Sequence, residues 1–418
     1  MWWLRGAGHQ IREAADDDRR VFARPAVESA VKSALGPWRV LDLLVIALPA
    51  AVAARVLDLG AAVLFVLAAL AVIPLAGLVG RSTEVLAERV GGSKGALLNA
   101  TFGNIAELLI AALLVVNGEI AVLKASITGS IIGNLLLLLG VAMIVAAHDK
   151  REVPITVTSR VQATMLFLAI GILLLPTVFS FRPESSTTRL DEVSALVAVI
   201  LFGVYALSML FMLRTNRSVF QAEEPNSGPG ADRGTAQLSG QGAEPEAVPT
   251  VDGGGGETGP GQTWSVKGAM VVLAAATALV AIAAEFVASS VQEAGASLGL
   301  HSGFIGFVIL PLVGNAAEQF SALALAAKDK MGVASEIAVG ASMQLAMLIV
   351  PVLVLLGALT GHPFDLAFSP LELSALIIGT LLTRHLLDDG KANWLEGVML
   401  LGLYLAFAGA VFFADLTG

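Results

Sequence analysis

Two glutamates stand within long apolar segments of this 418-residue chain. Glu107 ends the stretch Gly-Asn-Ile-Ala-Glu at 103–107, and Glu318 ends Gly-Asn-Ala-Ala-Glu at 314–318. Inserting a carboxylate this deep into a bilayer costs several kcal/mol of free energy, so a residue of this kind usually has a functional role. The alternative is a neutral glutamic acid that hydrogen-bonds to a neighbouring helix. The repetition of the same acid in the same setting argues against that alternative.

The Gly-Asn pair before each glutamate favours a local break in a helix. Gly103 and Gly314 lie one turn before the acids on the same helical face. Glycine permits both the close approach of two helices and an interruption of one. A break would free backbone carbonyl oxygens to point into a cavity beside the carboxylate. Asn104 and Asn315 would add amide oxygens there.

Polar side chains also occur at matching places in the apolar segments that follow. Gly129 and Gly340 each open a polar stretch. The side chains that these stretches could add to the site are Ser130, Asn134, Ser342 and Gln344. Oxygen ligands of this kind, with no sulfur or imidazole nearby, are those of a hard cation such as Ca2+. Two buried carboxylates that repel each other when ionised also bind protons, so one pair can hold a divalent cation or protons, but not both.

The two glutamate motifs belong to an internal repeat. Gly103 and Gly314 are 211 residues apart, and so are Gly129 and Gly340. The chain therefore contains two duplicated units of five helices each, preceded by one extra helix. Because five is odd, the second unit crosses the membrane in the opposite sense. Inverted repeats of this kind place a binding site near the bilayer midplane, between the units, and underlie alternating access in secondary transporters.

Composition identifies the class of protein that carries this repeat. Hydrophobic residues make up 56% of the chain and charged residues 14%, with a mean hydropathy of +0.81. We therefore predict an all-α polytopic membrane protein with about 11 transmembrane helices. The formal charge of −9 argues against a nucleic-acid partner, and the lack of cysteine excludes thiolate sites. The predicted helices lie near 41–59, 62–82, 97–117, 121–147, 158–180, 190–213, 266–290, 303–327, 334–357, 370–386 and 394–416.

The distribution of Lys and Arg predicts the orientation. The N-terminal segment and the even-numbered connections between helices hold 21 of the 25 Lys and Arg residues. Since such residues favour the cytoplasmic side, the N-terminus is expected there and the C-terminus outside. Residues 1–40 read as a cytoplasmic tail, and 221–263 as a disordered cytoplasmic linker with 11 Gly and 5 Pro. The linker separates helices 1–6 at 41–220 from helices 7–11 at 264–418.

Several long motifs surround the two glutamates, namely Glu84 with 97–108, 129–134, 304–306, 310–318 and 341–346. Together they resemble the cation/proton exchanger (CAX) family of calcium/proton antiporters, over roughly residues 41–416. The resemblance implies that Glu107 and Glu318 bind both Ca2+ and protons. It implies that the motif asparagines and the later polar residues line the same site. It also implies rocking of the first and sixth helices, as partners, against the second, third, seventh and eighth.

The resemblance suggests two further acids and has two departures. Family members often carry acids beside the ion path at the places of Glu84 and Glu285, and both are weaker candidates here. The family usually has a histidine after the second motif glutamate, where this chain has Gln319. The linker is Gly/Pro-rich instead of strongly acidic, so cation sensing by it is not expected.

Other classes of function were weighed against the antiporter. A sodium/calcium or other monovalent-cation exchanger of the same superfamily is the alternative. An intramembrane enzyme would need a nucleophile or a metal site with His or Cys, and a channel would usually need rotational symmetry between subunits. We expect no enzyme activity and no cofactor, only transported Ca2+ and H+. Lipids are the expected partners, a homo-oligomer stays open, and the expected location is the bacterial inner membrane.

Overall fold

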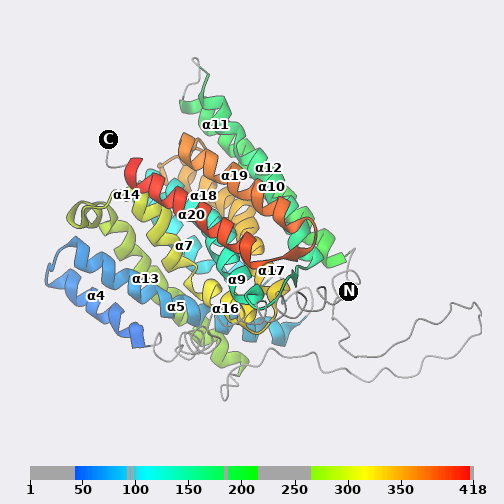
Figure 1. Cartoon of the computed structure of the whole chain (residues 1–418). Helices are drawn as coiled ribbons and strands as arrows, with labels where there is room; N and C mark the ends of the chain where they lie inside the picture. Colours follow the sequence, from blue (N-terminus) through cyan, green and yellow to red (C-terminus); the bar gives the residue numbers. More distant parts are fainter. Residues whose placement is uncertain are drawn as a thin grey trace, which may run out of the picture.

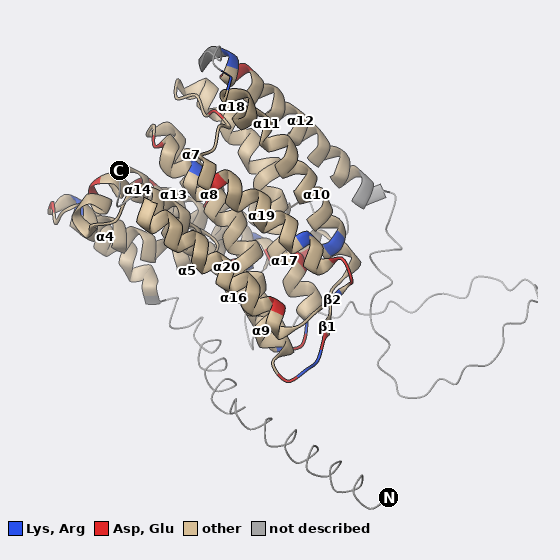
Figure 2. Ribbon diagram, turned by 45° about the horizontal axis from the view of Figure 1, so that its top comes forward, with Lys and Arg blue, Asp and Glu red and all other residues tan. Residues whose placement is uncertain are grey.

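The computed structural model describes residues 43–91, 95, 98–99, 101–182, 187–214 and 265–414 (Figure 1). The predicted N-terminal tail and central linker lie outside the described residues. The described chain is almost entirely helical, with a single two-stranded sheet. Charged residues gather mainly at helix ends and connections, while most helix middles carry none (Figure 2). The predicted class, an all-helical polytopic membrane protein, is confirmed.

The first half of the chain contains the extra helix and the helices of the first unit. The extra helix begins with a 3-10 turn, and the fourth predicted helix contains a π-helical segment. In order, the elements are η2 (Leu43–Ile46), α4 (Ala47–Val56), α5 (Ala61–Val90), α7 (Ile105–Val116), α8 (Ile120–Ile132), η3 (Gly133–Leu138), α9 (Leu139–Ala147), β1 (Val153–Pro154), α10 (Val157–Leu173), α11 (Leu175–Ser180) and α12 (Thr187–Arg214).

The second half repeats this succession in a similar order. Its eighth and ninth predicted helices each contain a π-helical segment. The elements are α13 (Val266–Leu298), α14 (Ser302–Phe304), η4 (Ile305–Ile309), α15 (Leu310–Gly314), α16 (Ala316–Ala327), α17 (Met331–Gln344), η5 (Leu345–Ile349), α18 (Val350–Thr360), α19 (Pro370–Leu387), β2 (Lys391–Ala392) and α20 (Trp394–Ala414).

The described residues contain eight helices long and apolar enough to cross a membrane. A ninth crossing is a broken pair, Ser302–Gly314 and Ala316–Ala327, bent by 61°. Leu44–Val56 and Ile105–Val116 are shorter apolar helices at the places of the first and third predicted segments. The predicted total of eleven is compatible with this set.

Two equivalent helices form the centre of the molecule. In Ile120–Ala147 and Met331–Thr360, 78% and 72% of the apolar window is buried, against 28% to 61% in the other single spans. The π-helical segments η3 and η5 interrupt them at nearly matching places. η3 includes Asn134 at the end of the first polar stretch, and η5 begins directly after Gln344. Such segments often occur at functional sites, where they reorient side chains.

The second and seventh helices form the most extensive helix pair. α5 has 30 residues and α13 has 33, and they pack along each other. Small buried residues permit the close approach, among them Ala68 and Ala76 of α5 and Ala283 and Ala284 of α13. The expected pairing of the first and sixth helices is wrong. α4 packs on α5, and α12 packs on α18, whereas the long pair consists of the first members of the two repeated units.

The connections between helices alternate between two ends of the molecule. At one end, Gln292 of α13 donates to Glu119 at 2.6 Å, and Lys124 of α8 pairs with Asp365 at 2.6 Å. We call this the outer end, after the predicted orientation. At the inner end, β1 pairs antiparallel with β2, and Lys150 pairs with Asp329. This grouping matches the predicted parity of the odd-numbered and even-numbered connections.

Candidate cation-binding site

Each Gly-Asn motif interrupts its helix, as predicted. Asn104 has φ −100° and ψ 22°, and Asn315 has φ −91° and ψ 6°. The two asparagines thus share one non-helical conformation, directly before α7 and α16 respectively. Glu107 and Glu318 consequently lie in the first turn of a new helix. The exposed N–H groups of such a turn favour a negative charge nearby.

The breaks do not free the carbonyl oxygens of the two motif asparagines. The carbonyl oxygen of Asn104 accepts from the Leu108 N–H at 3.0 Å, and that of Asn315 accepts from the Gln319 N–H at 2.9 Å. These two carbonyls therefore belong to the helices that follow them. A role for other carbonyls of the breaks stays a prediction.

The two motifs face each other across the boundary between the units. A Cβ atom on Gly314 would lie 3.3 Å from Cγ of Glu107, so the glycine leaves room for the glutamate of the other motif. The contact brings the Glu107 side chain to the motif that carries Glu318, four residues after this glycine. A cavity of about 10 Å³, the size of a single water, adjoins this contact. It is lined by Glu107, Ile110, Ala111, Ser126, Ile127, Ser130, Leu310, Gly314 and Leu345.

Each motif asparagine donates a hydrogen bond to the opposite unit. Nδ2 of Asn104 donates to Oε1 of Gln344 at 2.7 Å. Nδ2 of Asn315 donates to Oγ of Ser130 at 3.2 Å. The predicted grouping of the asparagines with the polar stretches of the fourth and ninth helices is thus visible in the geometry, with each pair drawn from different units.

Several polar atoms of the predicted site residues are buried without a hydrogen-bond partner among the described residues. They include both carboxyl oxygens of Glu107, both amide atoms of Asn134, Oδ1 of Asn315 and Oε2 of Glu318. Glu107 is only 8% exposed and Asn134 only 1%. Ser130 and Asn315 lie beside the Glu107 carboxyl, yet no hydrogen bond of ordinary geometry joins them to it. Buried polar atoms are normally paired, so this group is suited to a cation or to protons.

The remaining residues of the polar stretches have different positions. Ser342 is fully buried, and its hydroxyl donates to Ala338 O at 3.0 Å, in its own helix, and is 3.4 Å from Ile131 O. It therefore joins α17 to α8. Gly129 packs so closely on the backbone carbonyl of Phe307 that a Cβ atom would overlap it.

The weaker candidates lie elsewhere. Glu84 is exposed on α5, and the charges acting on it are those of Glu88 and Arg81. Glu285 is half-buried on α13 and accepts from Nδ2 of Asn117 at 3.5 Å. No described contact joins either acid to the motif glutamates.

Gln319 adjoins the second motif glutamate, and two polar residues were missed from the sequence. Nε2 of Gln319 is buried without a hydrogen-bond partner among the described residues. Ser126 lines the cavity, and its spacing of four residues from Ser130 was the available signal. Gln162 of α10 lies against Gly340, where a Cβ atom would be 3.2 Å from Nε2 of the glutamine. Nothing in the sequence around Gln162 marks it.

The chemistry of the donor set follows from its composition. Nowhere in the described chain do three His, Cys, Asp or Glu side chains converge. A cation at this place would be held by two carboxylates together with neutral amide, hydroxyl and water oxygens. Ca2+ accepts such mixed oxygen ligands in flexible geometry.

Comparison with known proteins identifies the family. The model of the family "Sodium/calcium exchanger protein" matches residues 60–214 and 268–413. The chain is 37% identical over 377 residues to the Ca(2+)/H(+) antiporter of Synechocystis sp., covering 90% of this chain and 97% of the relative. It is 34% identical over 373 residues to the Ca(2+)/H(+) antiporter ChaA of Bacillus subtilis, covering 88% and 98%.

Solved structures agree with this assignment. The structure of native YfkE matches with a TM-score of 0.72 and 30% identity, covering 90% of this chain and 99% of that one. The H+/Ca2+ exchanger CAX shares the fold, with a TM-score of 0.64 at 12% identity and coverage of 90% and 92%. The resemblance predicted from the motifs is confirmed. The chain belongs to the sodium/calcium exchanger protein family, in which the relatives it matches over nearly their whole length are Ca(2+)/H(+) antiporters.

Proposed function

We propose that this protein is a secondary antiporter that exchanges Ca2+ for H+ across a membrane by alternating access. The observation that carries the proposal is the contact of buried Glu107 with Gly314 of the opposite motif, which also carries half-buried Glu318. Near-full-length relatives named Ca(2+)/H(+) antiporter support the choice of ions. The protein acts as a carrier, with no catalysed covalent chemistry and no resident cofactor.

The two carboxyl groups account for the competition between the ions. One Ca2+ or two protons neutralise the same pair of negative charges, so occupancy by one ion excludes the other. Asn104, Asn315 and Ser130 supply neutral oxygens beside the pair, and water completes the coordination of Ca2+. Asn134, Ser342 and Gln344 complete the polar surroundings of the site. Exchange follows when the site meets the two sides of the membrane alternately.

The arrangement of helices suggests which parts move. α5 and α13 pack mainly on each other along 30 and 33 residues. The fourth and ninth helices are held in the buried centre. We assign the change of access to movement of the α5–α13 pair relative to that centre. Such movement opens a route to the glutamates at one end while closing it at the other.

The setting of the exchanger follows from the charge distribution and the bacterial relatives. The N-terminus faces the cytoplasm, the C-terminus faces outward, and the protein resides in the bacterial inner membrane. An inward proton gradient then drives calcium export. Residues 1–40 and 221–263 are a cytoplasmic tail and linker outside the transport machinery.

The first test measures calcium flux into proteoliposomes under an imposed pH gradient. Wild type is compared with Glu107→Gln and Glu318→Gln, which keep the side-chain shape and remove the charge. Glu372→Gln is the matched control, because Glu372 also lies in the first turn of a helix but accepts a hydrogen bond from the Ser369 N–H at 2.8 Å. Flux driven by the pH gradient is expected in wild type and in the control, and in neither site variant.

Two results would overturn the proposal. Flux that ignores the proton gradient and follows a sodium gradient would make the protein a sodium/calcium exchanger. Full activity with either site glutamate replaced would eliminate the shared pair as the binding site for any ion.

A further inference from the structure

An extended segment crosses the outer end of the molecule. Residues 362–368, here called the strap, connect α18 to α19 without regular secondary structure. Every second side chain of the strap is buried, at Phe364, Leu366 and Phe368. The strap is therefore built into the core, although it is a connection between helices.

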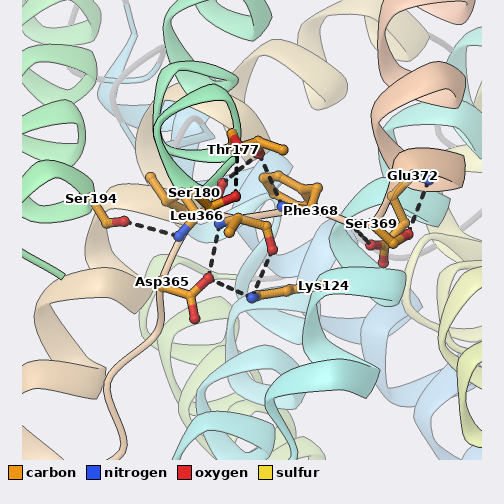
Figure 3. A network of polar contacts seen from close by, with 10 residues as sticks. Lys124, Thr177, Ser180, Ser194, Asp365, Leu366, Phe368, Ser369 and Glu372 are labelled. Atoms are coloured by element: carbon orange, nitrogen blue, oxygen red, sulfur yellow. Dashed lines mark hydrogen bonds and ion pairs between the residues drawn. The ribbon is translucent and has the colours of Figure 1, made fainter. Parts of the chain in front are cut away.

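Helices of the first unit hold the backbone of the strap. The Leu366 N–H donates to Oγ of Ser194 on α12 at 3.0 Å. Oγ1 of Thr177 on α11 donates to the Leu366 carbonyl at 3.0 Å and accepts from the Phe368 N–H at 3.0 Å (Figure 3). Thr177 and Ser194 are fully buried, so these bonds are sheltered from water.

A lysine of α8 completes the attachment. Nζ of Lys124 donates to Oδ1 of Asp365 at 2.6 Å and to the carbonyl oxygen of Ala367 at 2.8 Å (Figure 3). Oδ1 of Asp365 also accepts from the Ala367 N–H at 2.9 Å. The Lys124 and Asp365 side chains are only 15% and 29% exposed. Charge-assisted bonds in such a setting are stronger than those of an exposed ion pair.

The same helix carries part of the candidate site. Ser126 and Ser130 of α8 line the cavity beside Glu107. Ser130 lies six residues beyond Lys124, about 9 Å along the helix axis. The regular helix ends at Ile132, where η3 begins. The position of Ser130 therefore depends on how the outer part of this short helix is held.

The opposite face of α8 is already fixed by close packing. A Cβ atom on Gly306 would lie 2.7 Å from the carbonyl oxygen of Val122 and 2.9 Å from Cβ of Ala125. Gly129 packs in the same way on Phe307. α8 is thus held between η4 on one face and the strap on another, and Lys124 makes the ionic contact to the strap.

The second unit has a weaker contact at the equivalent place. Ser335 of α17 follows Lys124 by 211 residues, the spacing of the repeat. Its hydroxyl lies 2.7 Å from that of Ser159, at the inner end of the molecule. A pair of neutral hydroxyl groups thus stands where α8 has Lys124. The ion pair described at the inner end, Lys150 with Asp329, joins two connections and not a helix to a connection.

We propose that Lys124 is a positioning residue for cation binding from the outer side. By attaching α8 to the strap, it holds Ser130 in place beside Glu107 while the outer route to the site is open. Lys124 lies at the outer end of α8, so the effect is expected for Ca2+ that enters from that end. This inference rests on the proposed function.

The test compares calcium half-saturation on the two faces of the protein. Right-side-out and inside-out membrane vesicles are used for wild type, Lys124→Met, Lys124→Arg and Asp365→Asn. Lys124→Met and Asp365→Asn are expected to raise the half-saturating Ca2+ concentration at the outer face by about threefold or more, with little change at the inner face. Lys124→Arg keeps the charge and is expected to stay close to wild type.

A matched control lies at the other end of the molecule. Lys150 pairs with Asp329 between two connections, and its side chain is 43% exposed. Lys150→Met therefore removes an ion pair of the same type and is expected to leave half-saturation unchanged on both faces. If Lys124→Met does not fold, Asp365→Asn, which is nearly isosteric, carries the test alone.

The alternative is a purely structural attachment. It would lower the amount of folded protein or the maximal rate equally in both vesicle types, and half-saturation would not change on either face. That result overturns the inference. If wild type instead transports another cation, the proposed function fails, and the same comparison made with that cation still decides the role of Lys124.

Discussion

Asn104 and Gln344 are 240 residues apart in the sequence, yet Nδ2 of the asparagine donates to Oε1 of the glutamine at 2.7 Å. The first belongs to the broken third helix and the second to the end of α17. The bond therefore crosses the boundary between the two units, next to the candidate site. It fixes the orientation of the Asn104 amide. The bond therefore determines whether Oδ1 or Nδ2 of Asn104 faces the site.

Gln344→Leu should weaken cation binding. The change leaves the Asn104 amide without its partner, and an unpaired buried group of this kind costs about 1–3 kcal/mol. We expect the half-saturating Ca2+ concentration to rise by roughly tenfold, measured in the proteoliposome assay. Thr380→Ala is the control, because Thr380 is buried, as Asn104 is, but donates to Leu376 O within α19. Equal effects of the two changes would remove the special role of the bond.

Gly314→Ala should impair transport without unfolding the protein. The added methyl would lie 3.3 Å from Cγ of Glu107, so the glutamate must move away from the opposite motif. We expect at least about a fivefold lower rate of exchange, since transport depends on the geometry of the pair. Gly171→Ala on α10 meets no atom within 4 Å and should transport like wild type. An unchanged rate in Gly314→Ala would contradict close facing of the motifs.

Gly140→Ala and Gly397→Ala should each destabilise the fold. A Cβ atom on Gly140 would lie 2.8 Å from the Gly397 carbonyl oxygen, and one on Gly397 would lie 2.5 Å from the Gly140 carbonyl oxygen. Overpacking of this kind typically costs about 1–3 kcal/mol. The measurement is thermal unfolding of the purified protein in detergent. Gly409→Ala on α20, which meets nothing within 4 Å, should unfold at the wild-type temperature. The double variant should lose less stability than the sum of the two single variants. A single small increase in the distance between the two helices relieves both contacts.

Ca2+ should stabilise the protein against heat, and more so at alkaline pH. A ligand at 100 times its dissociation constant stabilises by about 2.7 kcal/mol. Protons occupy the same carboxyl groups, so acidification should weaken Ca2+ binding and reduce the rise in melting temperature. Thermal unfolding with and without Ca2+, at pH 8 and pH 6, checks this. Glu107→Gln should abolish the Ca2+ effect at both pH values; stabilisation that persists in this variant would place the ion elsewhere.

The sequence predicted the helices and the two breaks because both depend on local features. Long apolar runs form helices in a membrane, and the Gly-Asn pairs interrupt them at Asn104 and Asn315. The opposing positions of the two motifs followed from the repeat. By contrast, the resemblance paired the first helix with the sixth, whereas the long helices that pack on each other are α5 and α13, the first members of the two repeated units.

The strap and Ser126 could not be found in the same way. Apolar residues alternate at Phe364, Leu366 and Phe368, which is typical of a strand, but the segment pairs with no strand of the described chain. Its conformation depends on partners such as Thr177 and Ser194, which are more than 170 residues away. The spacing of four residues from Ser130 places Ser126 on the same face of α8. Its importance comes from the cavity that adjoins it, which only the packing of two units creates.

The strap and the β1–β2 ladder show that each unit satisfies main-chain groups of the other. The strap of the second unit takes its hydrogen bonds from Thr177 and Ser194 of the first, and β1 of the first unit pairs with β2 of the second. A single unit on its own would leave these main-chain groups without partners. A half-length ancestor would therefore have needed to form a dimer with a second copy of itself in the opposite membrane orientation. Gene fusion would later have joined the two copies in one chain.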